Sequence, residues 1–108
     1  MTSELLDLKL LDKAAVQNQD PEWPAYKKYF MHGTSHHIGL DTHDYGALLQ
    51  PMEKNMVFTV EPGIYIPEEG FGIRLEDDVV IQESGAPFNL MQNIPIEADE
   101  IETLMNKF

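Results

Sequence analysis

Leucines near the start of the chain recur at helical spacing, and this pattern predicts a short helix followed by a second helical turn. The leucines of this expected helical face are Leu5, Leu6, Leu8, Leu10 and Leu11. Thr2 or Ser3 is expected to cap the first helix, and Asp12 is expected to cap the turn that follows. The polar stretch at residues 18–24 contains two prolines and is therefore expected to form a loop.

From Met56 onward the hydrophobic pattern is typical of β-strands. The apolar run Met56–Val60 predicts a buried strand, and a second strand is expected at Ile64–Ile66. Glycines then mark a turn into a third expected strand at Ile73–Glu76, and Val79–Ile81 predicts a fourth. The middle of the chain is thus expected to be a strand-rich layer.

The end of the chain returns to helical periodicity. Apolar positions three and four residues apart predict a final helix. They are Ile101, Leu104, Met105 and Phe108. Acidic residues precede them, as the positive end of a helix dipole favours. Helices at both ends of a strand-rich middle predict the α+β class.

Charge and cysteine content exclude several classes of function. Nineteen acidic residues against seven lysines and arginines give a net charge of −12, so no cationic cluster is available for nucleic acid or an anionic membrane. The chain has no cysteine, which excludes disulfides, thiolate nucleophiles and zinc-finger sites. No apolar run approaches the length of a membrane span. We therefore expect a cytoplasmic protein that binds neither nucleic acid nor membrane.

Four histidines lie within one short stretch, HGTSHHIGLDTHD. They are His32, His36, His37 and His43. A single histidine is more often structural, but a cluster favours metal binding or proton transfer near neutral pH. His32 and His36 are four positions apart, which would place them on one face if the segment is a strand. Ser35 and His36 would point to opposite faces, and no G-x-S-x-G turn is present, so serine chemistry is disfavoured.

Two glutamates differ from the surface acids. Glu61 directly follows the expected buried strand, and Glu76 lies in GIRLED, where alternation would place it on the same face as Arg74. The alternative for Glu76 is a solvent-exposed pair with Arg74, which would contribute little. One imidazole with two carboxylates is a ligand set that suits manganese, cobalt or zinc. Two such metals can bind and activate a hydroxide between them.

Three blocks in order, FMHGTSHHIGLDTHD, MVFTVEPGIYIP and FGIRLEDDVVI, resemble the closing half of X-Pro aminopeptidases of the pita-bread metallopeptidase fold. The HGTSH form is more similar to aminopeptidase P than to prolidase. The resemblance implies a curved, antiparallel-rich sheet flanked by helices. It also implies that residues 1–108 are the C-terminal portion of a catalytic domain whose N-terminal half is absent.

The resemblance also implies residue roles. His36, Glu61 and Glu76 match metal ligands, with Glu61 also assisting proton transfer and Glu76 bridging both metals. His32 and His43 match histidines that contact substrate and stabilise charge on the scissile carbonyl oxygen. Arg74 matches an arginine that supports the site. The implied reaction is hydrolysis of the bond between an N-terminal residue and a following proline, with two divalent ions, manganese first and cobalt or zinc as alternatives.

Some positions depart from the family pattern. His37 and Tyr45 replace residues that are usually apolar, and Asn55 stands where glycine is common but can adopt the same left-handed conformation. His37 is not expected to be a ligand.

The D-x-G block that supplies two aspartate ligands is missing, which leaves three of the family's five protein ligands. We therefore expect the isolated chain to hold metal weakly or not at all, to be inactive and to self-associate. The alternatives are a prolidase-type dipeptidase, or a non-catalytic or metal-free relative acting as a binding module.

Overall fold

The computed structural model describes residues 1–47 and 49–107, so Phe108, expected in the last helical face, lies outside the described residues. The chain divides into two compact units. The first contains Met1–Gly33 and Pro62–Arg74, and the second contains Thr34–Glu61 and Leu75–Phe108. The helices of the described part are all too short or too polar to cross a bilayer.

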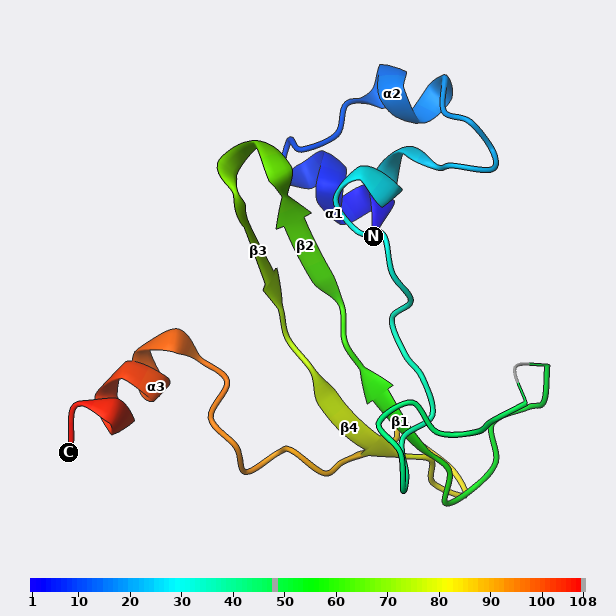
Figure 1. Ribbon diagram of the computed structural model, residues 1–108, viewed down its shortest axis with the longest axis vertical. Helices are drawn as coiled ribbons and strands as arrows, with labels where there is room; N and C mark the ends of the chain where they lie inside the picture. The colour runs from blue at the N-terminus through cyan, green and yellow to red at the C-terminus, as the bar shows by residue number, and fades with distance from the viewer. Residues whose placement is uncertain (48, 108) are drawn as a thin grey trace. The chain divides into compact units, whose positions relative to one another are not determined.

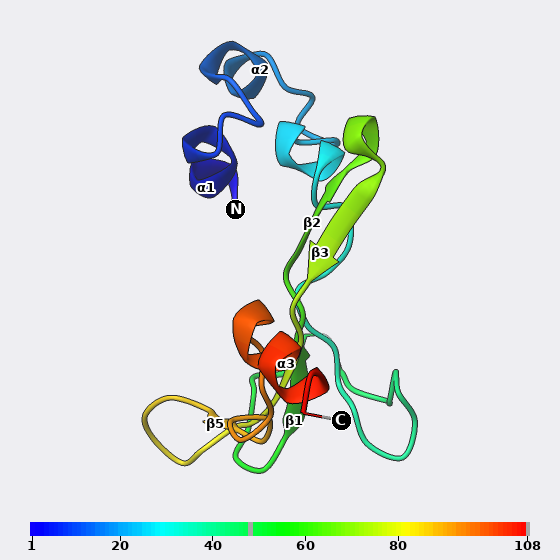
Figure 2. The ribbon, with the colours of Figure 1, turned by 90° about the vertical axis from the view of Figure 1, so that its left-hand side faces the viewer.

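The first unit combines three short helices with a β-hairpin. Its elements in chain order are α1 (Thr2–Asp7), α2 (Lys13–Gln17), the 3-10 helix η1 (Ala25–Lys28), β2 (Gly63–Ile66), the 3-10 turn η2 (Pro67–Glu69) and β3 (Phe71–Arg74). Strands β2 and β3 pair antiparallel, with Gly63 opposite Arg74. The helices gather at the end of the hairpin where η2 lies (Figures 1 and 2).

Two leucines of the predicted helical face, Leu5 and Leu11, lie in the core of this unit, whereas Leu8 is 59% exposed. Leu5 is fully buried, and it packs with Leu11 and Tyr29 against the hairpin residue Ile64. The Asp12 side chain caps α2 by accepting a hydrogen bond from the Ala15 amide at 2.7 Å, as predicted.

The predicted cap of α1 is wrong. Thr2 and Ser3 lie inside α1, and its N-cap is Met1, which makes no side-chain capping bond. The helix begins earlier than predicted because the Met1 carbonyl already accepts from the Leu5 amide at 3.0 Å.

The second unit contains a three-stranded antiparallel sheet in the order β1-β4-β5, where β1 is Val57–Val60, β4 is Asp77–Val80 and β5 is Phe88–Asn89. In the β1–β4 ladder Val57 pairs with Val80 and Val60 pairs with Asp77. Asn55, just before β1, has a φ of 71°, the left-handed conformation expected at that position. Both faces of β1 are covered at its centre, where Phe58 and Thr59 are buried.

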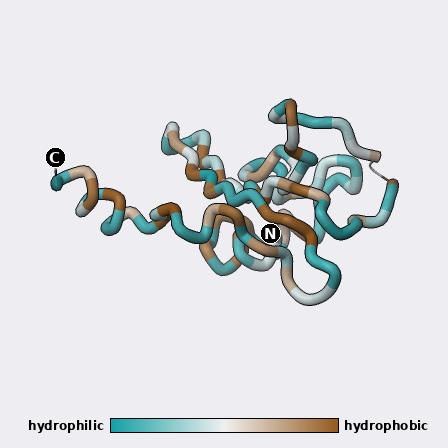
Figure 3. Tube along the Cα trace, turned by 90° about the horizontal axis from the view of Figure 1, so that it is seen from below, coloured by the Kyte–Doolittle hydropathy of each residue, from teal (hydrophilic) through white to brown (hydrophobic). Residues whose placement is uncertain are grey.

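Helix α3 (Ala98–Met105) forms where helical periodicity predicted it. Along this end of the chain, hydrophobic and hydrophilic positions alternate in short runs (Figure 3). The apolar side chains of α3 remain partly exposed, with Ile101 at 39% and Leu104 at 38%. The helix therefore presents a hydrophobic stripe that the described residues cover only in part.

The third predicted strand has different bounds from those expected. Strand β3 ends at Arg74, and Glu76 lies between β3 and β4. The prediction that Arg74 and Glu76 share one strand face is therefore wrong, because the strand does not continue through residue 76. Ile73, on the other expected face, is 62% exposed.

Candidate metal centre

Strand β1 has antiparallel neighbours along both edges, and these neighbours position the candidate ligands. One neighbour is β4. The other is the extended segment 34–38, in which the Thr34 carbonyl accepts from the Glu61 amide at 2.8 Å and the His36 carbonyl accepts from the Thr59 amide at 3.0 Å. An isolated bridge between His37 and Phe58 belongs to the same register.

This pairing explains how three residues that are distant in sequence converge. The β1–β4 register, continued by one pair beyond Val60 and Asp77, sets Glu61 opposite Glu76. His36 lies opposite Thr59, which makes it a diagonal neighbour of Glu61 on the same face. One ligand atom from each of His36, Glu61 and Glu76 lies within 4.8 Å of the others. The structure thus brings together the three residues expected to bind metal.

The hydrogen bonds of His36 orient its ring toward Glu61. Its Nδ1 lies 2.9 Å from the His37 carbonyl oxygen, and a carbonyl can only accept, so Nδ1 carries the proton and donates. Its Nε2 lies 3.2 Å from Glu61 Oε1. In the neutral ring Nε2 is an acceptor facing a second acceptor, so the contact requires either a proton or a metal ion between the two atoms. A backbone acceptor that fixes the tautomer is the usual arrangement for a metal-binding histidine.

The donor set fits a divalent cation. Glu61 is 9% exposed as a residue and 12% exposed in its side chain, His36 is half-buried, and Glu76 is exposed. Two carboxylates at such close range repel each other unless positive charge lies near them. One imidazole nitrogen and two carboxylate oxygens are ligands suited to manganese, cobalt or zinc.

His43 is brought to the site by a hydrogen-bonded loop. Its ring centroid lies 4.3 Å from that of His36, with the rings inclined at 63°. The Asp44 amide donates to the His37 carbonyl at 3.1 Å, and the Asp44 carboxylate accepts from the amides of Tyr45 and Leu40. Hydrogen bonds from these amides lower the pKa of Asp44, and the Tyr45 amide makes the largest contribution.

In the same loop, glycine at position 39 leaves room for the Asp44 carboxylate. A Cβ built on Gly39 would lie 2.1 Å from Asp44 Oδ2, so a larger residue would displace the carboxylate that closes the loop.

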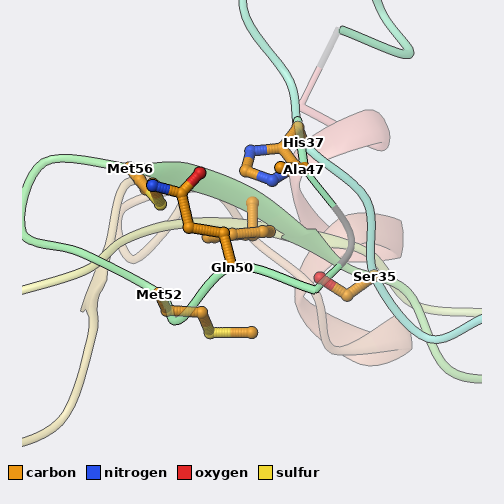
Figure 4. A pocket seen from close by; sticks show the side chains of 7 residues that line it. Ser35, His37, Ala47, Gln50, Met52 and Met56 are labelled. Atoms are coloured by element: carbon orange, nitrogen blue, oxygen red, sulfur yellow. The ribbon is translucent and has the colours of Figure 1, made fainter. Parts of the chain in front are cut away.

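The opposite face of β1 carries a small pocket of about 180 Å³. Side chains around it are shown in Figure 4. Its lining residues are Ser35, His37, Ala47, Gln50, Met52, Met56 and Phe58. The His37 ring packs on Phe58 with centroids 4.3 Å apart. Ser35 and His37 therefore face away from His36, as alternation along an extended segment requires.

His32 and Arg74 belong to the first unit. His32 Nδ1 lies 2.7 Å from the Gly33 carbonyl oxygen and therefore donates to it, and Nε2 lies 2.8 Å from the Tyr65 hydroxyl. Both ring nitrogens are thus engaged within this unit. Residues 31–36 form no regular strand, so the prediction that His32 and His36 share a strand face is wrong.

Two polar residues near the predicted site residues were missed from the sequence. Thr59 is 0% exposed and hydrogen-bonds both His36 and Glu61, and Tyr65 hydrogen-bonds His32. A signal for Thr59 was available, because Thr59 and Glu61 are two apart at the end of a strand and so share a face. No comparable sequence signal links Tyr65 to His32.

Comparison with known proteins identifies clear relatives. The model of the metallopeptidase family M24 matches residues 6–83. The Xaa-Pro aminopeptidase of Escherichia coli is 43% identical over an aligned length of 121 residues, gaps included, and the alignment covers 97% of this chain and 26% of that protein. Human Xaa-Pro aminopeptidase 3 is 34% identical over 120 residues, which cover 99% of this chain and 24% of that protein. The chain therefore spans about a quarter of the length of these curated relatives.

A solved structure shares the fold. Pseudomonas aeruginosa aminopeptidase PepP superposes with a TM-score of 0.79 at 35% identity, covering 98% of this chain and 26% of that protein. The α+β class and the pita-bread fold expected from the sequence are confirmed. In this chain the antiparallel strands form one three-stranded and one two-stranded sheet.

Proposed function

Because the chain belongs to metallopeptidase family M24, we propose that it supplies part of the dinuclear metal site of an X-Pro aminopeptidase. On this proposal residues 1–108 are a portion of a larger catalytic domain. The whole protein would release an N-terminal residue that precedes proline. The convergence of His36, Glu61 and Glu76, with ligand atoms within 4.8 Å of one another, is the observation that carries the proposal.

The proposed ligands differ in ways that suit different roles. The hydrogen bond from Nδ1 to the His37 carbonyl directs the Nε2 lone pair of His36 toward the site. Glu76, exposed and immediately before β4, would bind both metals. Glu61 is more buried and close to His36, so it would both bind metal and hold a proton during the reaction. Bound divalent metals would supply Lewis acidity, which polarises a substrate carbonyl and acidifies water.

The other proposed site residues act on the substrate. His43, whose ring meets that of His36 edge-on, would face the reacting carbonyl, and His32 would contact the substrate. Arg74 would support the site. Manganese is our first choice of metal, and cobalt or zinc is the alternative, because all three accept imidazole and carboxylate ligands. Peptides with proline second are the proposed substrates.

For the isolated chain we propose weak metal binding, no peptidase activity and self-association. Three protein ligands hold a dinuclear centre poorly, and exposed apolar residues such as Ile73 and Met105 favour association. A cytoplasmic location is proposed from the composition, with a net charge of −12 and no cysteine.

A chimaera tests whether the chain can supply a working half-site. The region of the E. coli relative that matches this chain is replaced by residues 1–108, and hydrolysis of a tripeptide with proline second is measured with added Mn²⁺. We expect activity, and a loss of at least about a hundredfold on His36→Ala or Glu76→Gln. His37→Ala is the matched control, because that ring faces the pocket on the opposite side of β1.

Three results would contradict the proposal in different ways. Equal loss in His37→Ala and His36→Ala would show that folding, and not ligation, limits activity. Full activity after chelation would favour a metal-free relative. Cleavage of X-Pro dipeptides alone would favour a prolidase.

A further inference from the structure

Thr59 lies at the centre of β1, between two of the proposed ligands, and its side chain contacts both. It is 0% exposed. The His36 amide donates to Thr59 Oγ1 at 3.0 Å, and the Thr59 hydroxyl donates to Glu61 Oε1 at 3.3 Å. The Thr59 amide also donates to the His36 carbonyl at 3.0 Å. One buried residue therefore joins the backbone of one ligand to the carboxylate of another.

The direction of these hydrogen bonds is fixed by their chemistry. An amide can only donate, so the hydroxyl must accept from His36. Its single proton is then left for Glu61, which as a carboxylate can only accept. The carboxylate oxygen that receives this proton is also the one that lies 3.2 Å from His36 Nε2. The Thr59 hydroxyl therefore donates to the Glu61 oxygen that faces the His36 imidazole.

We propose that Thr59 is a positioning residue of the metal site, which holds Glu61 and His36 in the arrangement that a divalent cation requires. This inference rests on the proposed function, because it assumes that those two side chains bind metal. Thr59 itself has no role as a ligand. Its hydroxyl restricts the Glu61 carboxylate to one orientation and anchors segment 34–38 to β1, so that fewer conformations are lost on binding the ion.

The side chain of threonine is suited to this position. Its β-branched shape favours a strand, and valine has the same shape without the hydroxyl. Thr59→Val therefore removes both side-chain hydrogen bonds with little change in volume. Thr59→Ser keeps the hydroxyl and removes a methyl group. The two variants separate hydrogen bonding from packing.

The experiment titrates the chain of residues 1–108 with Mn²⁺ and measures free ion by electron paramagnetic resonance. Thr59→Val should weaken binding about 10- to 100-fold, the range found for residues that orient metal ligands. Thr59→Ser should bind within about threefold of the parent chain, since the oriented donor remains. Thr103→Val is the control, because its hydroxyl donates to the Asp99 carbonyl at 2.7 Å in α3. That control should bind as the parent chain does.

Circular dichroism and thermal melting establish that each variant is folded. If Thr59→Val does not fold, Thr59→Ala replaces it with the same expected loss, because its small side chain also lacks the hydroxyl. A folded Thr59→Val or Thr59→Ala variant that binds Mn²⁺ as tightly as the parent chain would overturn the inference and leave the proposed function intact. So would a Thr59→Ser variant that loses affinity as severely as Thr59→Val. An absence of measurable Mn²⁺ binding by residues 1–108 agrees with the weak binding proposed for the isolated chain, and the same variants are then compared in the chimaera. An unchanged Mn²⁺ affinity of Thr59→Val in the chimaera would overturn the inference, and an absence of Mn²⁺ binding by the chimaera would overturn the proposed metal site.

Discussion

Replacing Glu61 by glutamine should stabilise the metal-free chain while weakening its binding of divalent cations. The two effects have opposite signs because the same negative charge that attracts a cation repels its neighbour when no cation is bound. Ligand atoms of Glu61 and Glu76 lie within 4.8 Å of each other, and Glu61 Oε1 lies 3.2 Å from His36 Nε2. Glutamine keeps the shape of the side chain and removes its charge.

The expected gain in the stability of the metal-free chain follows from these distances. Two unit charges 4.8 Å apart repel by about 0.9 kcal/mol in water and by about 3.5 kcal/mol at an effective dielectric constant of 20. Glu76 is exposed, so the repulsion is expected near the lower value, about 1 kcal/mol. A glutamine NH2 group that donated to His36 Nε2 would replace the oxygen that accepts from the Thr59 hydroxyl, so the hydrogen bond gained and the hydrogen bond lost offset each other. The gain of about 1 kcal/mol corresponds to a rise of roughly 4–8 °C in Tm.

Differential scanning calorimetry at pH 8, with and without Mn²⁺, measures both effects. The parent chain should melt at a higher temperature when Mn²⁺ is added, because an ion that binds only the folded state stabilises it. Glu61→Gln should melt higher than the parent without metal and should respond less to Mn²⁺. Glu83→Gln is the control, because Glu83 is 76% exposed and pairs with Lys54 at 2.6 Å. It should change Tm little and keep the response to Mn²⁺.

A lower Tm for metal-free Glu61→Gln, combined with an undiminished response to Mn²⁺, would refute this reasoning. That result would mean that Glu61 is a structural carboxylate stabilised by its neighbours. A rise in Tm for Glu83→Gln equal to that for Glu61→Gln would attribute the effect to the overall negative charge of the chain. In that case repulsion between Glu61 and Glu76 would not account for the gain in stability.

Two further predictions concern neighbouring hydrogen bonds. Tyr65→Phe removes the hydroxyl 2.8 Å from His32 Nε2, so the Nε2 resonance of His32 should move in a nitrogen NMR spectrum; an unchanged resonance would mean that the bond is absent in solution. Hydrogen bonds from the amides of Tyr45 and Leu40 lower the pKa of Asp44 in the folded chain. The ionised Asp44 side chain therefore contributes to stability above pH 3.8, which is its ordinary pKa, and this contribution is lost as the pH falls through the lower pKa of the folded state. Asp44→Asn should therefore lose less stability than the parent chain on acidification below pH 3.8, as measured by urea unfolding; parallel acid slopes would contradict this.

Local patterns determined most of the secondary structure. Helical spacing of leucines and the Asp12 cap predicted the start of the chain, and apolar runs predicted β1, β2 and β4 within a residue or two. These predictions depend on side-chain periodicity and capping, which act over a few residues. The exact cap of α1 and the end of β3 were predicted incorrectly, because element boundaries depend on hydrogen bonds that periodicity does not specify.

The sequence by itself determined the kinds of ligand available, namely clustered histidines and two glutamates beside strands. That the ligand atoms of His36, Glu61 and Glu76 meet was decided only by the tertiary structure. Their meeting depends on the register of segment 34–38 and β4 against β1, and a shift of one residue would turn each side chain to the other face. The role inferred for Thr59 has the same origin, because its hydroxyl reaches His36 across 23 positions of sequence. Such pairing is fixed by contacts between distant segments, and so it appears only when the strands are assembled.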